Sequence, residues 1–403
     1  MDFKQKSIIE SLNSVPVLIG KTFPIPRKFR GALPSDIMEL SRLLTNSRGE
    51  RKLSYLSQPK YLSAYLHYFL PWNLYRLCLL LPSLNLSLKA GDKITDLGCG
   101  PLTFASALWI SYPALRKIPL EINCVDRVQP VMEAGKDFFT QLALNTNKDG
   151  NIPWKINLIK KDINILKEKP GNSAKTDCSF LSAINLFNEM HDRISHNDIN
   201  GLRKTASNAA NFMHGKAAKE TPILIVEPGV PQSGKFISLL RNSFIELGRN
   251  IISPCTHIEA CPLTPKYQGG VKQRWCHCAL ETPDVPKELN RLSAAAKLPK
   301  ERLTFSYLLT GNKNEQPFNP VSSNQDSPNL ESSKNVRIIS DAFPLPDNQY
   351  GRYGCSSLGL VLLKGQKTRI EKLNPLYIAE TGKLNDNKDA FDAKSGAKIM
   401  ELI

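Results

Sequence analysis

One short stretch, residues 93–108, constrains the fold of this chain more than any other. An apolar segment over 94–97 leads directly into Gly98 and Gly100, which are separated by one residue. Apolar residues at helical spacing begin just after Pro101, and proline fits a first helical turn because its missing N–H would have no partner there. Glycine lets the backbone approach a ligand closely, and the N-terminus of the following helix faces that ligand. The stretch therefore predicts the strand, turn and helix of a nucleotide-binding α/β domain.

The residue types of the turn favour one kind of ligand. Asp96 ends the strand, and the order Asp96-x-Gly98-x-Gly100 resembles the S-adenosylmethionine turn of Rossmann-like methyltransferases. A dinucleotide-binding turn would require a glycine at position 103, which is threonine. Because S-adenosylmethionine has no phosphate, an acid beside the glycines is compatible with it and unfavourable for a pyrophosphate. A tight turn without a ligand is the alternative interpretation.

Strand and helix patterns alternate over residues 91–250, which predicts a parallel sheet covered by helices. The expected strands lie at 93–97, 120–126, 155–159, 179–186 and 222–227. Acids lie at the ends of the first three strands, namely Asp96, Asp126 and Asp162, and ligands of open α/β sheets bind at the carboxyl ends of strands. We expect Asp126 to accept hydrogen bonds from ribose hydroxyls and Asp162 from an adenine amino group. The alternative is that each acid is a helix cap or a loop residue.

The cysteines form the second informative pattern. The chain has nine, and five of them follow residue 250: Cys255, Cys261, Cys276, Cys278 and Cys355. The first residues carry no secretory pattern, so we predict a cytoplasmic protein, in which clustered thiols indicate a metal or catalysis rather than disulfides. The spacing matches neither a zinc ribbon nor a two-cluster ferredoxin. Zinc and iron–sulfur both stay open, with His257 and His277 as further candidate zinc ligands.

Charge and composition suggest a partner. Lys and Arg number 53 against 37 acids, a net charge of +16, which favours an anionic partner such as RNA. A merely basic protein is the alternative. The apolar run at 77–88 is short and broken by Pro82, so we expect no membrane span, and we expect a monomer. The expected regions are a helical basic N-terminal region (1–90), a Rossmann-like domain (91–250), a cysteine-rich β module (251–365) containing a disordered insertion (311–334), and a polar tail (366–403).

The pattern as a whole resembles the methyltransferase-like proteins of small-ribosomal-subunit assembly, a family of mitochondria and bacteria. The stretches that carry the resemblance are, in order, 65–71, 96–100, 225–229, 254–263, 275–277 and 302–307. They extend over roughly residues 55–365, and the cysteine-rich stretch is the most specific of them.

The resemblance implies more than the residues show by themselves. In that family four cysteines hold a 4Fe–4S cluster, and the matching residues here are Cys255, Cys261, Cys276 and Cys355. Cys278 falls where the family carries an aromatic residue. The resemblance also implies S-adenosylmethionine as cofactor and the small ribosomal subunit with its rRNA as partner. One difference concerns Leu102, which stands where the family has a third glycine and would crowd the methionine end of the cofactor.

We therefore expect an S-adenosylmethionine-dependent methyltransferase-like protein of small-subunit rRNA assembly or translation, with an iron–sulfur cluster. A catalytically inactive RNA-binding assembly factor and a zinc-stabilised RNA-binding module are the alternatives. The segment 188–191 follows the fourth strand and lacks the Asn/Asp-Pro-Pro-aromatic motif of amino-group methyltransferases. The sequence thus identifies no catalytic residue, although methyl transfer can proceed by proximity and alignment alone.

Overall fold

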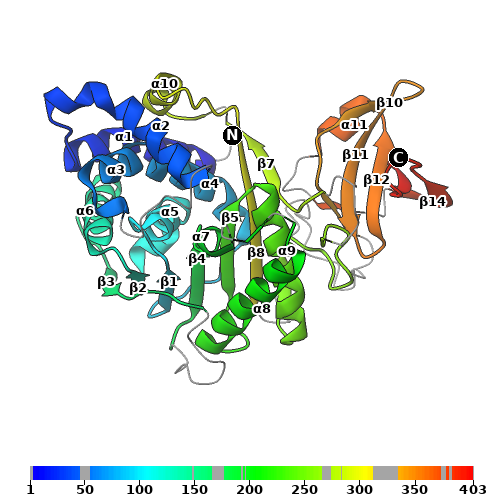
Figure 1. The fold of residues 1–403 in the computed structure, drawn as a ribbon, viewed down its shortest axis with the longest axis horizontal. Helices are drawn as coiled ribbons and strands as arrows, with labels where there is room; N and C mark the ends of the chain where they lie inside the picture. The colour runs from blue at the N-terminus through cyan, green and yellow to red at the C-terminus, as the bar shows by residue number, and fades with distance from the viewer. Residues whose placement is uncertain are drawn as a thin grey trace. The chain divides into compact units, whose positions relative to one another are not determined.

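The computed structural model describes most of the chain and divides it into two compact units (Figure 1). The described ranges are 3–45, 55–147, 149–165, 177–191, 194–195, 197–265, 274–282, 284–311, 335–373, 378–380 and 384–402. The first unit comprises Met1–Lys167, Thr176–Leu186 and Glu281–Leu303, and the second Glu168–Lys175, Phe187–Leu280 and Thr304–Ile403. The predicted insertion at 311–334 lies almost entirely outside the described residues.

A parallel sheet forms the centre of the first unit. Its strands are β1 (Lys93–Leu97), β2 (Leu120–Asp126), β3 (Trp154–Lys160) and β4 (Phe180–Ile184), in the order β3-β2-β1-β4. All three neighbouring pairs are parallel, as the alternation of strand and helix patterns predicts. The bounds expected for the first two strands agree with the structure, because each segment carries buried apolar residues and has an acid at or next to its last residue.

The N-terminal region of the first unit is helical, as expected. Its helices are α1 (Phe3–Thr22), α2 (Leu33–Thr45), α3 (Pro59–Ala64), the π-helical turn η4 (Tyr65–Phe69) and α4 (Leu70–Leu80). Three more helices follow in the chain, α5 (Thr103–Ser111), α6 (Gln129–Thr146) and α10 (Lys287–Ala295). Every residue of α5 is buried, which suits a helix that is apolar on all sides. Helix α6 packs on β2 and β3, and α1 packs on α6.

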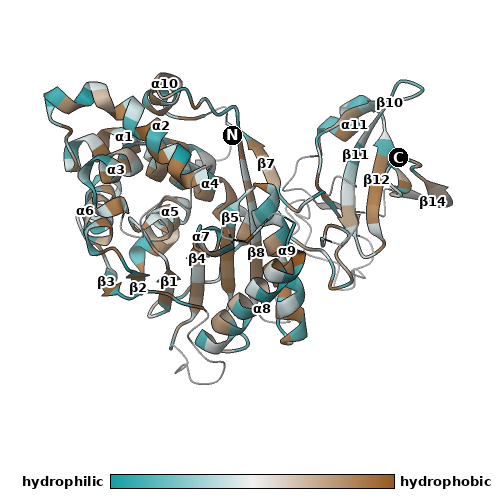
Figure 2. Ribbon diagram, in the orientation of Figure 1, coloured by the Kyte–Doolittle hydropathy of each residue, from teal (hydrophilic) through white to brown (hydrophobic). Residues whose placement is uncertain are grey.

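The second unit contains antiparallel strands and the remaining long helices. Strand β8 (Arg302–Gly311) runs antiparallel to β5 (Ile223–Pro228) and to β6 (Asn250–Ser253), and it also pairs with β7 (Cys278–Glu281). Strand β5 is brown over most of its length in Figure 2, since its first four residues are apolar and buried. The helices are α7 (Asn188–His191), α8 (Ile199–Lys216) and α9 (Pro231–Glu246).

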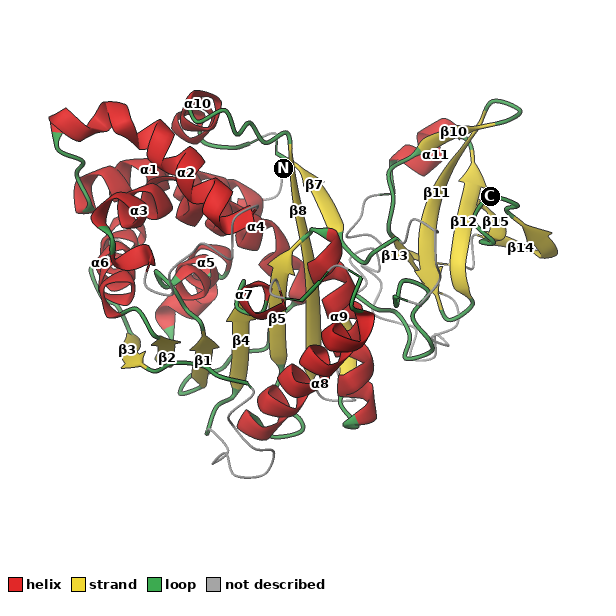
Figure 3. Cartoon of the chain, in the orientation of Figure 1, coloured by secondary structure: helices red, strands yellow, loops and turns green. Residues whose placement is uncertain are grey.

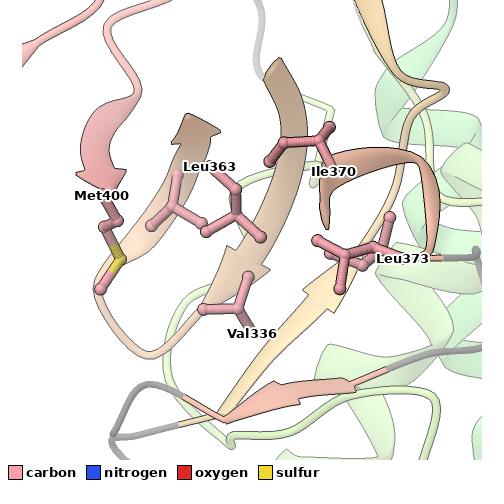
Figure 4. Close-up of a cluster of buried hydrophobic side chains, with 7 residues drawn as sticks. Val336, Leu363, Ile370, Leu373 and Met400 are labelled. Carbon is pink, nitrogen blue, oxygen red and sulfur yellow. The ribbon is translucent and has the colours of Figure 1, made fainter. Parts of the chain in front are cut away.

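A separate sheet of seven strands completes the second unit (Figure 3). The strands are β9 (Asn335–Ile338), β10 (Phe343–Leu345), β11 (Gln349–Ser356), β12 (Gly359–Gly365), β13 (Ile378–Glu380), β14 (Leu384–Phe391) and β15 (Lys398–Leu402). One short helix, α11 (Lys367–Glu371), packs on β11 and β12. Figure 4 shows side chains from β9, β12, β15 and α11 that gather into a small core, among them Val336, Leu363, Ile370 and Met400.

The C-terminal segment differs from the polar tail expected over 366–403. Strand β15 pairs in parallel with β12, with Met400 opposite Leu363 and buried. Met400 belongs to the core of this sheet, together with Val361 on β12. The segment is rich in lysine, and only one side chain of β15 is fully buried. The sequence therefore shows no clear apolar strand pattern here.

Candidate cofactor and cysteine sites

Three residues of the turn after β1 have left-handed backbone conformations. The φ angles are +68° at Gly98, +52° at Gly100 and +54° at Leu102. Helix α5 begins at Thr103, one residue later than the sequence pattern predicts, because Leu102 in this conformation cannot lie inside a helix. The side chain of Leu102 is 0% exposed, so it packs in the interior. The position that glycine would favour is thus held by a buried leucine.

The backbone N–H groups of Gly98, Cys99 and Gly100 are used within the protein. Gly98 and Cys99 donate hydrogen bonds to the carbonyl oxygen of Val125, at 2.8 and 3.1 Å. Gly100 donates to Oδ2 of Asp126 at 3.0 Å. A phosphate-binding turn directs such N–H groups at its ligand. The turn therefore has no free N–H groups at these three residues, which suits a ligand without phosphates.

Asp126 connects the ends of β1 and β2. Its Oδ2 accepts from Gly100, and its Oδ1 accepts from the N–H of Val128 at 3.0 Å. The side chain is half-buried, and each carboxylate oxygen retains a second lone pair for an outside donor. Asp162, two residues beyond β3, is exposed, and no hydrogen bond within the described ranges joins it to the other acids. The structure thus brings Asp96 and Asp126 together, whereas Asp162 only lies at the same end of the sheet.

Asp96 is buried, with 1% of its surface exposed. Ser182 on β4 donates a hydrogen bond to its Oδ1 at 2.6 Å, while its Oδ2 has no partner among the described residues. Burial raises the pKa of the Asp96 carboxyl to about 7; the negative charge of Asp126 acts in the same direction and the Ser182 hydrogen bond opposes it. A buried carboxyl oxygen without a donor is costly unless a ligand satisfies it.

Two polar residues near these strands were not expected from the sequence. Ser182 is the donor to Asp96, and Asn185, just beyond β4, has φ +55° and a buried side-chain oxygen without a partner in the described part of the chain. Asparagine tolerates this conformation better than most residues. The sequence gives no signal for Ser182, because it is the pairing of β4 with β1 that places this residue opposite Asp96.

The second unit has its own buried acid at the end of β5. Glu227 accepts hydrogen bonds from the N–H groups of Phe187 and Asn188, at 2.8 and 3.0 Å. Its side chain therefore fixes the start of α7. This explains the glutamate in the 225–229 stretch as a residue that holds the segment after β4.

The five late cysteines gather in the second unit. Cys255 and Cys261 lie in the loop after β6, Cys276 lies two residues before β7, Cys278 is the first residue of β7, and Cys355 is on β11. All are buried except Cys261, which is partly exposed. The charges of Cys255, Cys261, Cys276 and Cys355 act on one another, which places the four thiols in one region. Within the described residues, however, no three His, Cys, Asp or Glu side chains are arranged to hold a metal ion.

A buried arginine lies among these thiols. Arg337 on β9 is 3% exposed, and its Nη1 donates to the sulfur of Cys276 at 2.9 Å. Its Nη2 donates to the sulfur of Cys278 at 3.2 Å. Burial alone would lower the pKa of this guanidinium, but the charges of Cys276, Cys278 and Cys355 raise it well above its usual value. The thiols thus receive a fixed positive charge that favours their thiolate form.

A second arginine positions the loop that carries Cys255 and Cys261. Arg241 on α9 is buried, and its Nη2 donates to the carbonyl oxygens of His257 at 2.7 Å and Glu259 at 2.9 Å. Burial raises the pKa of Cys255 to about 11, and the charge of Arg241 opposes this shift. Burial, with the charge of Arg241, lowers the pKa of His257 to about 4, so this imidazole is neutral at pH 7.

His277 contacts Trp275 through both its ring and its Nδ1 atom. Its ring stacks on Trp275 with ring centres 5.2 Å apart, and its Nδ1 lies 3.2 Å from the carbonyl oxygen of Trp275. The indole of Trp275 in turn donates to the carbonyl oxygen of Gly229 at 3.0 Å. The histidine thus braces the segment that contains Cys276.

The fold and these two sites define a class: an α/β protein with a glycine turn whose Gly98, Cys99 and Gly100 N–H groups bond within the protein, and with a cysteine-rich β region. Residues 103–340 match the family described as mitochondrial small ribosomal subunit Rsm22, and this chain belongs to that family. The match includes Cys255, Cys261, Cys276 and Arg337, and it lies between the glycine turn and Cys355. A search of curated proteins finds no match.

The chain is also similar to several solved structures at low sequence identity. One is a putative class I S-adenosylmethionine-dependent methyltransferase of Listeria monocytogenes, with 10% identity, a TM-score of 0.33, and coverage of 78% of this chain and 90% of that one. Another is Aeropyrum pernix fibrillarin with bound S-adenosyl-L-methionine, with 14% identity, a TM-score of 0.28, and coverage of 59% and 76%. No helix in the described part of this chain is long and apolar enough to cross a membrane.

Proposed function

We propose that this protein is an S-adenosylmethionine-dependent methyltransferase-like factor of small-ribosomal-subunit rRNA assembly or translation, and that it carries a 4Fe–4S cluster. Membership of the Rsm22 family, whose description names the mitochondrial small ribosomal subunit, carries the proposal. The net charge of +16 supports an RNA partner.

The residues of the first unit fit the cofactor. The unpartnered Oδ2 of Asp96 suits the ammonium of the methionine moiety, which would restore the charged form of this carboxyl. Asp126 would accept from the ribose hydroxyls while it continues to hold Gly100 and Val128, and Asp162 from the adenine amino group. Gly98 and Gly100 shape the turn against which the cofactor lies. When bound, S-adenosylmethionine supplies an electrophilic methyl group.

Calorimetry with S-adenosylmethionine tests this assignment. We expect the wild type to bind and Asp126→Ala to weaken binding at least tenfold, because the ribose would lose its acceptor and the turn its anchor. Asp137→Ala, an exposed acid on α6, is the matched control and should bind normally. Absence of binding by the wild type would contradict the cofactor proposal.

The catalytically inactive alternative has one observation in its favour. Leu102 places a buried side chain where the family turn carries glycine, directly after the residues that would hold the cofactor. Sucrose-gradient profiles with crosslinked RNA distinguish the two functions. If Asp96→Ala and Asp126→Ala remain with the small subunit, ribosome association does not require the cofactor. If the wild type does not sediment with the subunit, the ribosomal proposal is wrong.

The cysteines of the second unit fit an iron–sulfur cluster in their chemistry. Cys255, Cys261, Cys276 and Cys355 are the proposed ligands, and Arg337 provides the positive charge that an assembly of thiolates requires. Cys278, which also contacts Arg337, is a neighbour of the site. The cluster, when bound, would brace the three segments that contribute ligands.

Anaerobic purification decides the identity of the metal. We expect coloured protein with iron and acid-labile sulfide in equal amounts, and Cys261→Ser should lose both. Cys178→Ser, a buried cysteine of the other unit, is the control. Colourless protein that contains zinc would instead support the zinc-stabilised module.

The compartment and oligomeric state are part of the proposal. The sequence predicts a cytoplasmic monomer, while the family description names the mitochondrial ribosome. Imaging of the tagged chain distinguishes the two compartments, and sedimentation equilibrium tests the monomer.

A further inference from the structure

Two basic side chains lie together in the first unit, away from the glycine turn. Arg76 is on α4, and Lys300 follows α10. The ammonium of Lys300 lies 5.3 Å from the centre of the Tyr68 ring and 5.1 Å from that of the Trp72 ring. The guanidinium of Arg76 donates through Nη1 to Asn73 at 2.9 Å. Its buried Nε has no partner in the part of the chain that the structure describes.

The positive charges of Arg76 and Lys300 are not neutralised by an acid of the described residues. Neither forms an ion pair with a carboxylate of the described residues. Burial lowers the pKa of Arg76 to about 10, and burial together with the charge of Arg76 lowers the pKa of Lys300 to about 7. Both side chains keep part of their surface in contact with solvent, so an external anion can reach them.

The protein fixes this arrangement with hydrogen bonds. Tyr68 donates through its hydroxyl to the carbonyl oxygen of Leu298 at 3.0 Å, and Trp72 through its indole to Ser293 at 3.1 Å. These bonds hold the end of α10, and with it Lys300, against η4 and α4. The turn η4 is π-helical, a conformation that occurs frequently at functional sites. Lys300 is therefore held over the rings of Tyr68 and Trp72, and Arg76 lies one helical turn after Trp72 on α4.

We propose that Arg76 and Lys300 form a binding site for a phosphate group. The guanidinium of Arg76 and the ammonium of Lys300 supply two charged donors, and a phosphate matches two positive charges better than a single carboxylate does. Tyr68 and Trp72 are themselves buried beneath Lys300, so the site has no ring face for a base. The ligand is thus recognised by its phosphate, free or within an RNA backbone.

Thermal unfolding of the full chain tests the site, with inorganic phosphate titrated against chloride at equal ionic strength. We expect phosphate to raise the Tm of the wild type and of Arg291→Gln, an exposed control on α10. Lys300→Met should lose this rise and, without phosphate, should be at least as stable as the wild type, because one of two repelling charges is gone. Arg76→Lys keeps the charge but lacks Nε, and should show a smaller rise. An equal rise in Lys300→Met and the wild type would overturn the proposal.

A second measurement identifies the source of the phosphate. Binding of a fluorescent single-stranded oligoribonucleotide that weakens at least tenfold in Lys300→Met, and less than twofold in Arg291→Gln, assigns the site to an RNA backbone. Unchanged RNA affinity together with a lost response to inorganic phosphate assigns it to a free phosphate. The phosphate site involves neither the cofactor residues nor the cysteines. A negative result in these measurements would therefore leave the cofactor and metal proposals unaffected.

Discussion

The environment of Asp96 decides how this residue can act. An acid at the end of a strand suggests a solvated carboxylate, but this side chain is buried and has one oxygen without a donor. A pKa of about 7 makes its charge depend on pH in the physiological range and on whatever ligand satisfies the second oxygen.

Asp96→Asn should change how stability depends on pH. The folded pKa of about 7 exceeds the ordinary value of 3.8, so the folded state binds the proton more tightly between these values. Stability of the unliganded wild type therefore falls as pH rises through this window, by at most about 1.4 kcal/mol per pH unit. Urea unfolding at pH 5 and pH 8 should show a smaller difference in Asp96→Asn, whereas the exposed Asp137→Asn should behave as the wild type. An identical pH dependence in Asp96→Asn would refute the pKa assignment.

Leu102→Gly should destabilise the protein despite its favourable backbone angle. Relief of the left-handed conformation gains about 1–2 kcal/mol. Loss of a fully buried leucine side chain costs about 2–5 kcal/mol, and this effect is the larger. We expect a net loss of about 1–3 kcal/mol in urea unfolding. A more stable variant would show that backbone strain outweighs packing at this position.

Arg337→Met should reduce the metal content of the purified protein. The variant keeps the volume but leaves Cys276 and Cys278 without their charged donor. Iron or zinc analysis should show the loss, and Arg337→Lys should recover only part of it, since one ammonium cannot bond two sulfurs as the guanidinium does. Arg369→Met, on the exposed face of α11, is the control. A full metal content in Arg337→Met would show that the charge of Arg337 is not needed for metal binding.

At the scale of elements, β15 shows how a few residues fix a segment of polar composition. The strand pairs with β12 over Lys398–Glu401, and its one fully buried side chain, Met400, joins the core in Figure 4. The backbone ladder and one apolar contact are enough to add a strand to an existing sheet edge.

Met400→Ala should therefore destabilise the second sheet by about 2–4 kcal/mol, through loss of buried contacts. Hydrogen exchange should quicken in β12 and β15, which pair directly. Glu401→Ala, at an exposed neighbouring position, should exchange as the wild type does. Equal exchange in both variants would mean that β15 contributes no packing.

At the scale of the whole molecule, the proposed metal ligands come from segments about 100 residues apart, from Cys255 to Cys355. Metal binding to such a set is coupled to folding. Anaerobic chelation should lower Tm and quicken hydrogen exchange at 255–261, 276–278 and in β11. Strands β1–β4 belong to the other unit and serve as the internal reference. Unchanged exchange around the cysteines after metal removal would contradict a structural role for the metal.

The sequence by itself determined the parallel strands β1–β4, because apolar runs ending in acids and glycines have few other solutions. The sequence also indicated that the five cysteines after residue 250 form a candidate site. Only the tertiary structure decided that Val125 and Asp126 use the N–H groups of the turn, that Asp96 is buried beside Ser182, and that Arg337 reaches the thiols of Cys276 and Cys278. Each of these contacts joins strands or loops that are distant in the chain. Local patterns report strand and helix propensity, whereas the charge and hydrogen bonding of a buried group depend on which distant segments fold against it.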